Sequence, residues 1–285
     1  DKFYIPRFGT GLTKQIDVFA NDEQCVCIVE CKAAEKPHTK QSLGKDIDQL
    51  AAIRRDIELS IFSHYRDDSR KLKKLKSVWI LATKNIDISE NDFERAKQAR
   101  IRILDDIQYY SDLSNHFGHS SKYQFLADMF PGINIPGLIE PLPALKGRMG
   151  KEVFYSFVME PEKLLKIAYI AHRGKTNEED IDTYQRMARK SRLNRIAQYI
   201  HDKKGIFPTS IVINIETTRP LKFERSAETI GKNAILGTLY LPNKYRTAWI
   251  IDGQHRLFAY SDLEEAKTAT LPVIAFVNLE ADRQA

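Results

Sequence analysis

Short apolar runs, each about the length of one strand, recur along the chain and constrain its fold more than any other feature. Residues 25–31, CVCIVEC, are nearly continuous in apolar character, as are residues 77–83, SVWILAT, and residues 271–279, LPVIAFVNL. Such runs are typical of strands buried on both faces of a sheet. Residues 44–61 instead carry apolar side chains at helical spacing. Strands that alternate with helices predict an α/β (α+β) fold with mixed sheets flanked by helices.

The length of the chain and one breaker-rich segment predict two domains. A chain of 285 residues favours two hydrophobic cores over one. Residues 131–150 hold four prolines and four glycines, a composition that interrupts both helices and strands. We therefore expect a first domain at 1–130, closed by a helix at 110–129, then a linker at 131–150 and a second domain at 151–285.

Composition and charge exclude several classes of protein. No apolar run approaches the roughly 18 residues of a membrane span, and no signal peptide opens the chain. All three cysteines lie on one short segment, which fits neither a disulfide framework nor a zinc site and favours a reducing, cytoplasmic location. The net charge of +6 permits a polyanionic partner.

The two ends of the sequence lead us to expect a fragment. The chain starts at Asp1 without a methionine and stops soon after an apolar strand. We expect the second domain to be truncated at its C-terminus.

Three polar residues stand out where the first apolar run ends. The segment 14–32 alternates as two strands around a turn at Asn21-Asp22, so Glu30 and Lys32 share one face at a spacing of about 7 Å. Asp17, on the preceding strand, can lie beside Glu30. Two carboxylates can hold a divalent cation, and a neighbouring lysine can position or deprotonate a water that attacks a phosphate.

This arrangement resembles a known nuclease core. Asp17, followed after a hairpin by Glu30-Cys31-Lys32, is similar to the D…ExK core of the PD-(D/E)xK nucleases, and the order of elements over roughly 10–110 resembles the Mrr-type restriction endonuclease domain. The resemblance implies cleavage of DNA with Mg²⁺ or Mn²⁺. It assigns catalytic roles to Asp17, Glu30, Lys32 and Gln49, and metal ligation to Asp17, Glu30 and the Cys31 carbonyl.

Two observations keep an alternative open for the first domain. Ile16 stands before Asp17 where the family pattern has proline, and a helical glutamine such as Gln49 is commonly just solvated. The domain could therefore hold DNA without cutting it.

A second polar cluster follows the strand at 248–251 and precedes a helix predicted at 257–266. Its members are Asp252, Gly253, Gln254, His255 and Arg256. Glycine allows close backbone approach, while free N–H groups at a helix start and the arginine fork favour a phosphate. Asp252 could bind a metal or a ribose hydroxyl, or orient His255. An internal Asp–Arg pair is the structural alternative. Arg195, on a helix predicted at 181–203, is a candidate for a second phosphate contact.

The letters DGQHR also carry a resemblance. With RLNRIAQYI upstream and LPVIAFVNL downstream, they are similar to the DGQHR-domain family, which includes the B protein of the bacterial DNA phosphorothioation (Dnd) system. More distantly, the G-x-H-R core is similar to the phosphate-binding box of ParB-type and sulfiredoxin-like proteins. The resemblance spans roughly 150–285 and implies contact with a nucleotide or with DNA phosphates.

Taken together, the two resemblances predict a bacterial DNA-processing enzyme of a modification or restriction defence system. In it, a metal-dependent endonuclease domain is coupled to a DGQHR domain that binds DNA or a nucleoside triphosphate. Two alternatives stay open: a DNA-binding regulator of the Dnd B-protein type that cuts nothing, and a nucleotide hydrolase. The expected partner is DNA rather than a membrane, and a homo-oligomer or other defence-system proteins are further partners left open.

Overall fold

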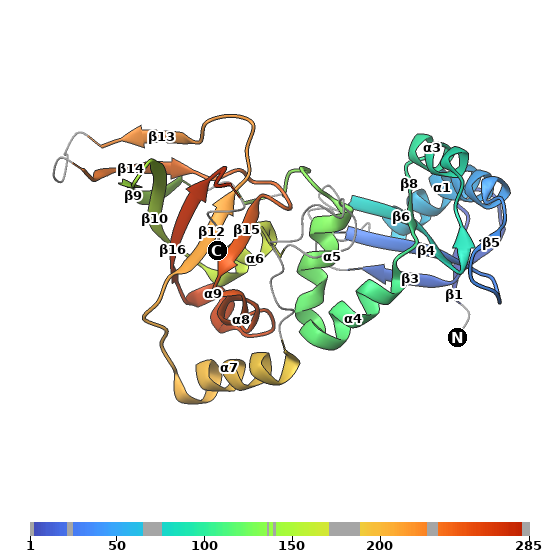
Figure 1. The fold of residues 1–285 in the computed structure, drawn as a ribbon. Helices are drawn as coiled ribbons and strands as arrows, with labels where there is room; N and C mark the ends of the chain where they lie inside the picture. The colour runs from blue at the N-terminus through green and yellow to red at the C-terminus, as the bar shows by residue number, and fades with distance from the viewer. Residues whose placement is uncertain are drawn as a thin grey trace. The chain divides into compact units, whose positions relative to one another are not determined.

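The computed structural model describes residues 3–21, 25–64, 76–135, 137–138, 141–170, 189–226 and 233–280 (Figure 1). The chain divides into two compact units, Asp1–Tyr109 and Tyr110–Ala285, called unit 1 and unit 2. The described elements of unit 1 are β1 (Phe3–Pro6), β2 (Thr13–Ile16), β3 (Val18–Asn21), β4 (Cys25–Ala33), β5 (Thr39–Lys40), α1 (Gly44–His64), β6 (Lys76–Lys84), β7 (Ile86–Asp87), α3 (Glu90–Gln98) and β8 (Ile101–Leu104).

The main sheet of unit 1 is mixed, as the alternation of strands and helices predicted. Among the described residues its strands lie in the order β3-β4-β6-β8. β4 is antiparallel to β3 and parallel to β6, which is parallel to β8. Parallel neighbours need a long crossover between them, and α1 lies in the connection from β4 to β6.

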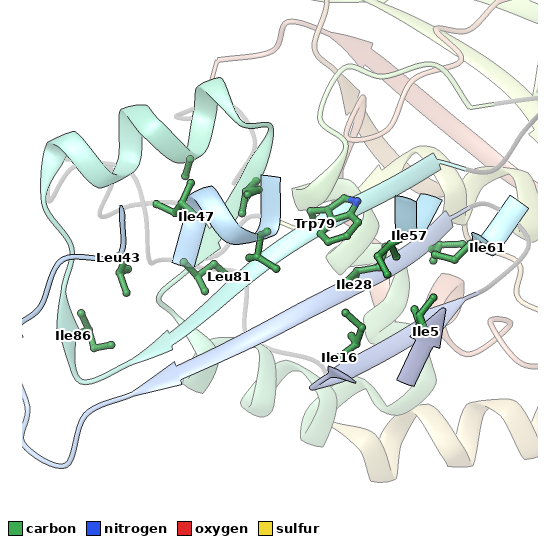
Figure 2. Packing of buried hydrophobic residues seen from close by; sticks show 14 residues of the cluster. Ile5, Ile16, Ile28, Leu43, Ile47, Ile57, Ile61, Trp79, Leu81 and Ile86 are labelled. Atoms are coloured by element: carbon green, nitrogen blue, oxygen red, sulfur yellow. The ribbon is translucent and has the colours of Figure 1, made fainter. Parts of the chain in front are cut away.

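The core of unit 1 lies between α1 and one face of this sheet. Val26 and Ile28 of β4 are buried together with Trp79 of β6 and Ile47 and Ile57 of α1. Figure 2 shows the labelled Ile28, Trp79 and Ile57 side chains close together. Alternate residues of a strand share a face, so the residues of β4 with even numbers form the face that α1 covers.

A partly buried polar contact fixes α1 to β6. Glu58 Oε1 accepts hydrogen bonds from Ser77 Oγ at 2.6 Å, Trp79 Nε1 at 3.1 Å and Arg54 Nε at 3.0 Å. Partly buried donors of this kind need acceptors, so the carboxylate sets how α1 lies along the sheet.

Unit 2 is the larger unit. Its described elements, with α4 crossing the division, are α4 (Ile107–Phe117), η2 (Gly118–Ser120), α5 (Ser121–Met129), β9 (Pro141–Met149), β10 (Glu152–Met159), α6 (Pro161–Ile167), β11 (Ala168–Tyr169), α7 (Lys190–Lys203), β12 (Ile211–Ile215), β13 (Lys222–Arg225), β14 (Ile235–Tyr240), β15 (Ala248–Asp252), α8 (Gln254–Phe258), α9 (Glu265–Thr268) and β16 (Leu271–Val277).

A single large sheet organises the described part of unit 2. Its strands lie in the order β11-β15-β12-β16-β10-β9-β14-β13. β16 is parallel to β12 on one side and antiparallel to β10 on the other. Its residues Val273 and Ala275 are fully buried, in agreement with the strand that the apolar run predicted. α8 packs against β12 and against α6 and α7.

The predicted linker at 131–150 was wrong over much of its length. Residues 141–149 form β9, which pairs with β10 through residues 144–149 and with β14 through residues 141–146. Pro141 and Pro143 lie on the part of β9 that pairs only with β14. Every second N–H there points away from the partner strand, so a proline costs no ladder hydrogen bond.

The units divide between Tyr109 and Tyr110, before the boundary expected at 130. The helix predicted to close the first domain belongs mostly to unit 2, where Gln124 Oε1 accepts a hydrogen bond from the Ile170 N–H at 2.9 Å. That helix is also interrupted, because Gly118 has a φ of 58°. The helix predicted at 257–266 is likewise two short pieces, α8 and α9.

The helix predicted at 181–203 is described from α7 onward, and its earlier part lies outside the described residues. Within the residues that the structure describes, no helix is long and apolar enough to cross a membrane.

Candidate functional site

Glu30 and Lys32 lie near the end of β4, on the face that α1 covers. Earlier in the strand this face is lined by apolar core residues, whereas near its end Lys32 Nζ lies 3.6 Å from Glu30 Oε1. Lys32 Nζ also lies 3.1 Å from Asp46 Oδ1, in the first turn of α1. The crossover helix therefore brings a third charged residue to the pair that the sequence predicted.

Asp17 joins this group from the neighbouring strand. It sits in a bend between β2 and β3, and the β3–β4 register pairs Val18 with Val29. One step further along that register places Asp17 opposite Glu30. Asp17 Oδ2 accepts a hydrogen bond from the Cys31 N–H at 2.8 Å, so its carboxylate lies against the main chain between Glu30 and Lys32.

Lys14 is a further member of the group. Its Nζ lies 3.7 Å from Glu30 Oε2, so each oxygen of Glu30 faces one lysine. Sequence reasoning missed Lys14 and Asp46, because their contacts depend on how β2 and α1 pack rather than on spacing along β4. The acidic residue in the first turn of the helix after β4 was the available signal for Asp46.

Gln49, the fourth predicted catalytic residue, lies at the surface. It is exposed on α1, three residues after Asp46, and residues three apart are neighbours on a helix surface. Gln49 is therefore a neighbour of Asp46 on α1, but its side chain faces solvent.

The electrostatics of the group keep Lys32 charged. The hydrogen bond with Asp46 raises the pKa of Lys32, opposed by burial and reinforced by the charges of Asp46 and Glu30. Burial, and then the charges of Asp17 and Glu30, raise the pKa of the Cys31 thiol. A lysine that stays protonated offers an ammonium to a phosphate instead of removing a proton from water.

The donor atoms suit a hard divalent cation. Carboxylate and carbonyl oxygens are the ligands that Mg²⁺ and Mn²⁺ take, and Asp17, Glu30 and the Cys31 carbonyl could supply them. In the described ranges, no three His, Cys, Asp or Glu side chains are grouped so that they could hold a metal ion. A cation would therefore depend on two carboxylates and the main chain.

The second predicted site is the turn from β15 into α8. Gly253 has φ 94° and ψ 10°, a left-handed conformation that glycine adopts most readily. A Cβ atom there would lie 2.6 Å from Ile211 Cδ1 and 3.1 Å from Arg256 Nη2. The predicted close backbone approach is therefore made to β12 of the same unit.

The guanidinium of Arg256 donates hydrogen bonds to other residues of unit 2. Nη1 donates to the carbonyl and hydroxyl oxygens of Thr209, and Nη2 donates to Asp252 Oδ2 at 3.0 Å. The Arg256 side chain is 15% exposed, against 72% for Asp252. This geometry is the internal Asp–Arg pair that the sequence left as the alternative to a phosphate contact.

His255, the next member of the cluster, has a pKa below its ordinary value. Burial lowers the pKa of His255, and the positive charge of Arg192 on α7 lowers it further, while Asp252 opposes the shift. Gln254 is partly buried at the start of α8, and Arg195, the predicted second phosphate contact, is exposed on α7. The α7 charge that acts on His255 thus comes from Arg192.

Comparison with known proteins bears on this second site. Residues 142–285, from the second residue of β9 onward, match the DndB family, described as DNA-sulfur modification-associated. No curated protein and no solved structure matches the chain. The matched region contains the DGQHR turn and covers half of the sequence, so the chain belongs to the DndB family.

Proposed function

We propose that this DndB-family protein serves a DNA phosphorothioation system and that its unit 1 is a divalent-metal-dependent DNA endonuclease. The observation that carries the proposal is the meeting of Asp17 with the main chain between Glu30 and Lys32. Two carboxylates beside a lysine, at the end of a central strand, suit phosphodiester hydrolysis.

Each residue of the group has a distinct role in this proposal. Asp17 and Glu30, with the Cys31 carbonyl, would hold Mg²⁺ or Mn²⁺, which when bound supplies an activated water and offsets phosphate charge. Lys32 would place its ammonium against a phosphate oxygen. The ion pairs that Lys32 makes with Glu30 and Asp46 hold that ammonium at the site.

The test is plasmid nicking by the purified chain with Mg²⁺, with Mn²⁺ and with chelator alone. Glu30→Gln and Lys32→Ala should each lower the cleavage rate by about 100-fold, the usual loss when one preorganised charged group is removed. Glu35→Gln and Lys36→Ala are matched controls, because these residues lie just after β4 and are exposed. The controls should cut at the wild-type rate.

Two results would count against the nuclease. Equal cutting by the wild type and both site variants would assign the activity to another site or to a contaminant. No cutting by the wild type with either metal would favour the second function described below.

The second candidate is a DNA-binding protein that does not cut. The observation that favours it is the pairing of both Glu30 oxygens with lysines, which satisfies the carboxylate without a cation. In that case DNA binding, followed by gel shift, should be the same with chelator and with Mg²⁺, and Glu30→Gln should bind DNA at least as tightly as the wild type.

A further inference from the structure

A pocket in unit 2 is lined by none of the residues of the two sites described above. It has a volume of about 640 Å³ and is lined by residues of α4, η2, α5 and the start of α7. All of its lining residues belong to unit 2, and none lies in the DGQHR turn. Pockets of roughly 300–1,000 Å³ are the size of small-molecule sites.

The charged groups that line the pocket are cationic. Lys122 on α5, Lys190 in the first turn of α7 and His119 in η2 contribute to its wall, and all three are exposed. The described lining residues include no aspartate or glutamate. Two carboxylates outside the lining contact it: Asp128 Oδ2 accepts a hydrogen bond from the Tyr110 hydroxyl at 3.1 Å, and Asp262 Oδ1 lies 3.9 Å from His119 Nδ1. Like charges around a hollow attract an anion.

An aromatic pair lies in the same wall. The rings of Tyr110 and Phe125 meet edge to face with their centroids 5.5 Å apart, and both residues line the pocket beside Ser114 and Asn115. Aromatic rings next to cations form the kind of surface on which nucleic-acid bases stack while their phosphates are neutralised. Hydroxyl and amide side chains can bond to base edges or sugar hydroxyls.

The wall is fixed in advance by contacts that do not involve a ligand. Gly118 turns the chain between α4 and α5 with a φ of 58°, and Ser121 Oγ donates to its carbonyl at 2.7 Å. Ser120 Oγ donates to the Phe258 carbonyl of α8 at 3.1 Å. A preformed wall lowers the ordering cost of binding.

We propose that this pocket binds a nucleotide, with its phosphate at Lys122 and Lys190 and its base beside Tyr110 and Phe125. The nucleotide is either free or part of a single DNA strand, since both present the same chemistry. The proposal does not depend on cleavage by unit 1, because all of its residues lie in unit 2.

The test uses two probes in chelator-containing buffer, so that no metal-dependent cleavage takes place. One is deoxyadenosine monophosphate, followed by calorimetry, and the other is a fluorescein-labelled single-stranded decanucleotide, followed by anisotropy. Lys122→Ala and Lys190→Ala should each weaken binding about tenfold, as expected for one lost charge-assisted hydrogen bond to phosphate. Lys151→Ala, an exposed lysine at the β9–β10 turn, is the matched control and should bind as the wild type does.

The two probes separate the two sources of the nucleotide. Lysine-dependent binding of the monophosphate identifies a free nucleotide, and lysine-dependent binding of the decanucleotide alone identifies a DNA strand. Tyr110→Ala should weaken whichever probe binds, because the base loses a stacking surface. The proposal is overturned if neither probe binds, or if the two pocket lysine variants bind as Lys151→Ala does.

Discussion

The substitution Gly253→Ala tests whether the DGQHR turn is packed as described. Alanine at φ 94° is strained by about 1–2 kcal/mol, and its Cβ would lie 2.6 Å from Ile211 Cδ1, an overpacking that typically costs about 1–3 kcal/mol. The stiffer unfolded chain returns about 0.4–1 kcal/mol. Unit 2 should therefore lose about 2–4 kcal/mol of unfolding free energy.

The chain offers a clean assay for this loss. Of its two tryptophans, Trp79 lies in unit 1 and Trp249 in unit 2. In a Trp79→Phe background, tryptophan fluorescence reports unfolding of unit 2 alone. The expected loss corresponds to a fall in melting temperature of about 5–15 °C for a unit of this size.

A second substitution identifies the clash. Ile211→Val removes the Cδ1 atom and by itself should cost about 0.5–1.5 kcal/mol. In the Ile211→Val background Gly253→Ala should cost about 1 kcal/mol less than in the wild type. Unchanged melting after Gly253→Ala, or strictly additive effects of the two substitutions, would refute the close packing of the turn on β12.

Four further predictions concern ionisable groups. Glu58→Leu should lower the unfolding free energy of unit 1 by about 1–3 kcal/mol, because Arg54, Ser77 and Trp79 lose a shared hydrogen-bond acceptor. The fluorescence of Trp79, in β6, measures this loss. The pKa of His255, followed by NMR titration, should lie below 6.5, so unit 2 should keep full stability above pH 6.5 and lose some as the pH falls further. Arg192→Gln should raise that pKa only part of the way, because burial is its first cause. Asp46→Asn should lower the pKa of Lys32, measured by NMR of the labelled Cε; no change would exclude their hydrogen bond.

The sequence predicted the elements around β4 well because local and global signals agree there. The apolar run that became β4 and the helix that became α1 both follow from hydrophobic periodicity. The nearness of Asp17 to Glu30 also follows, because strand pairing at a hairpin fixes the register. The ion pair of Lys32 with Asp46 did not follow, since it depends on the packing of α1.

The β9 segment shows where composition misleads. Prolines and glycines normally interrupt strands, yet Gly147 lies opposite Phe154 in the β9–β10 register. A Cβ at Gly147 would lie 2.6 Å from the Phe154 ring, so the glycine makes room for the aromatic side chain. Only the pairing partners, which are distant in sequence, show that these residues suit a strand.

The role of Arg256 could not be decided from the motif. A strand-to-helix turn with aspartate and arginine suits either an anion or an internal pair, and the choice depends on what the flanking chain presents. Thr209, 47 residues earlier, supplies the two oxygen acceptors that complete the internal arrangement.

The position of β16 in the large sheet has a consequence for how the protein is made. β16 joins β12 to β10, yet its residues, 271–277, are translated after every other strand of the sheet. Until they emerge from the ribosome, the strands β11-β15-β12 and β10-β9-β14-β13 share no backbone hydrogen bonds and each group ends in an open edge. Open strand edges are templates for pairing with other chains, so the two strand groups are exposed to mispairing until β16 takes its place between β12 and β10.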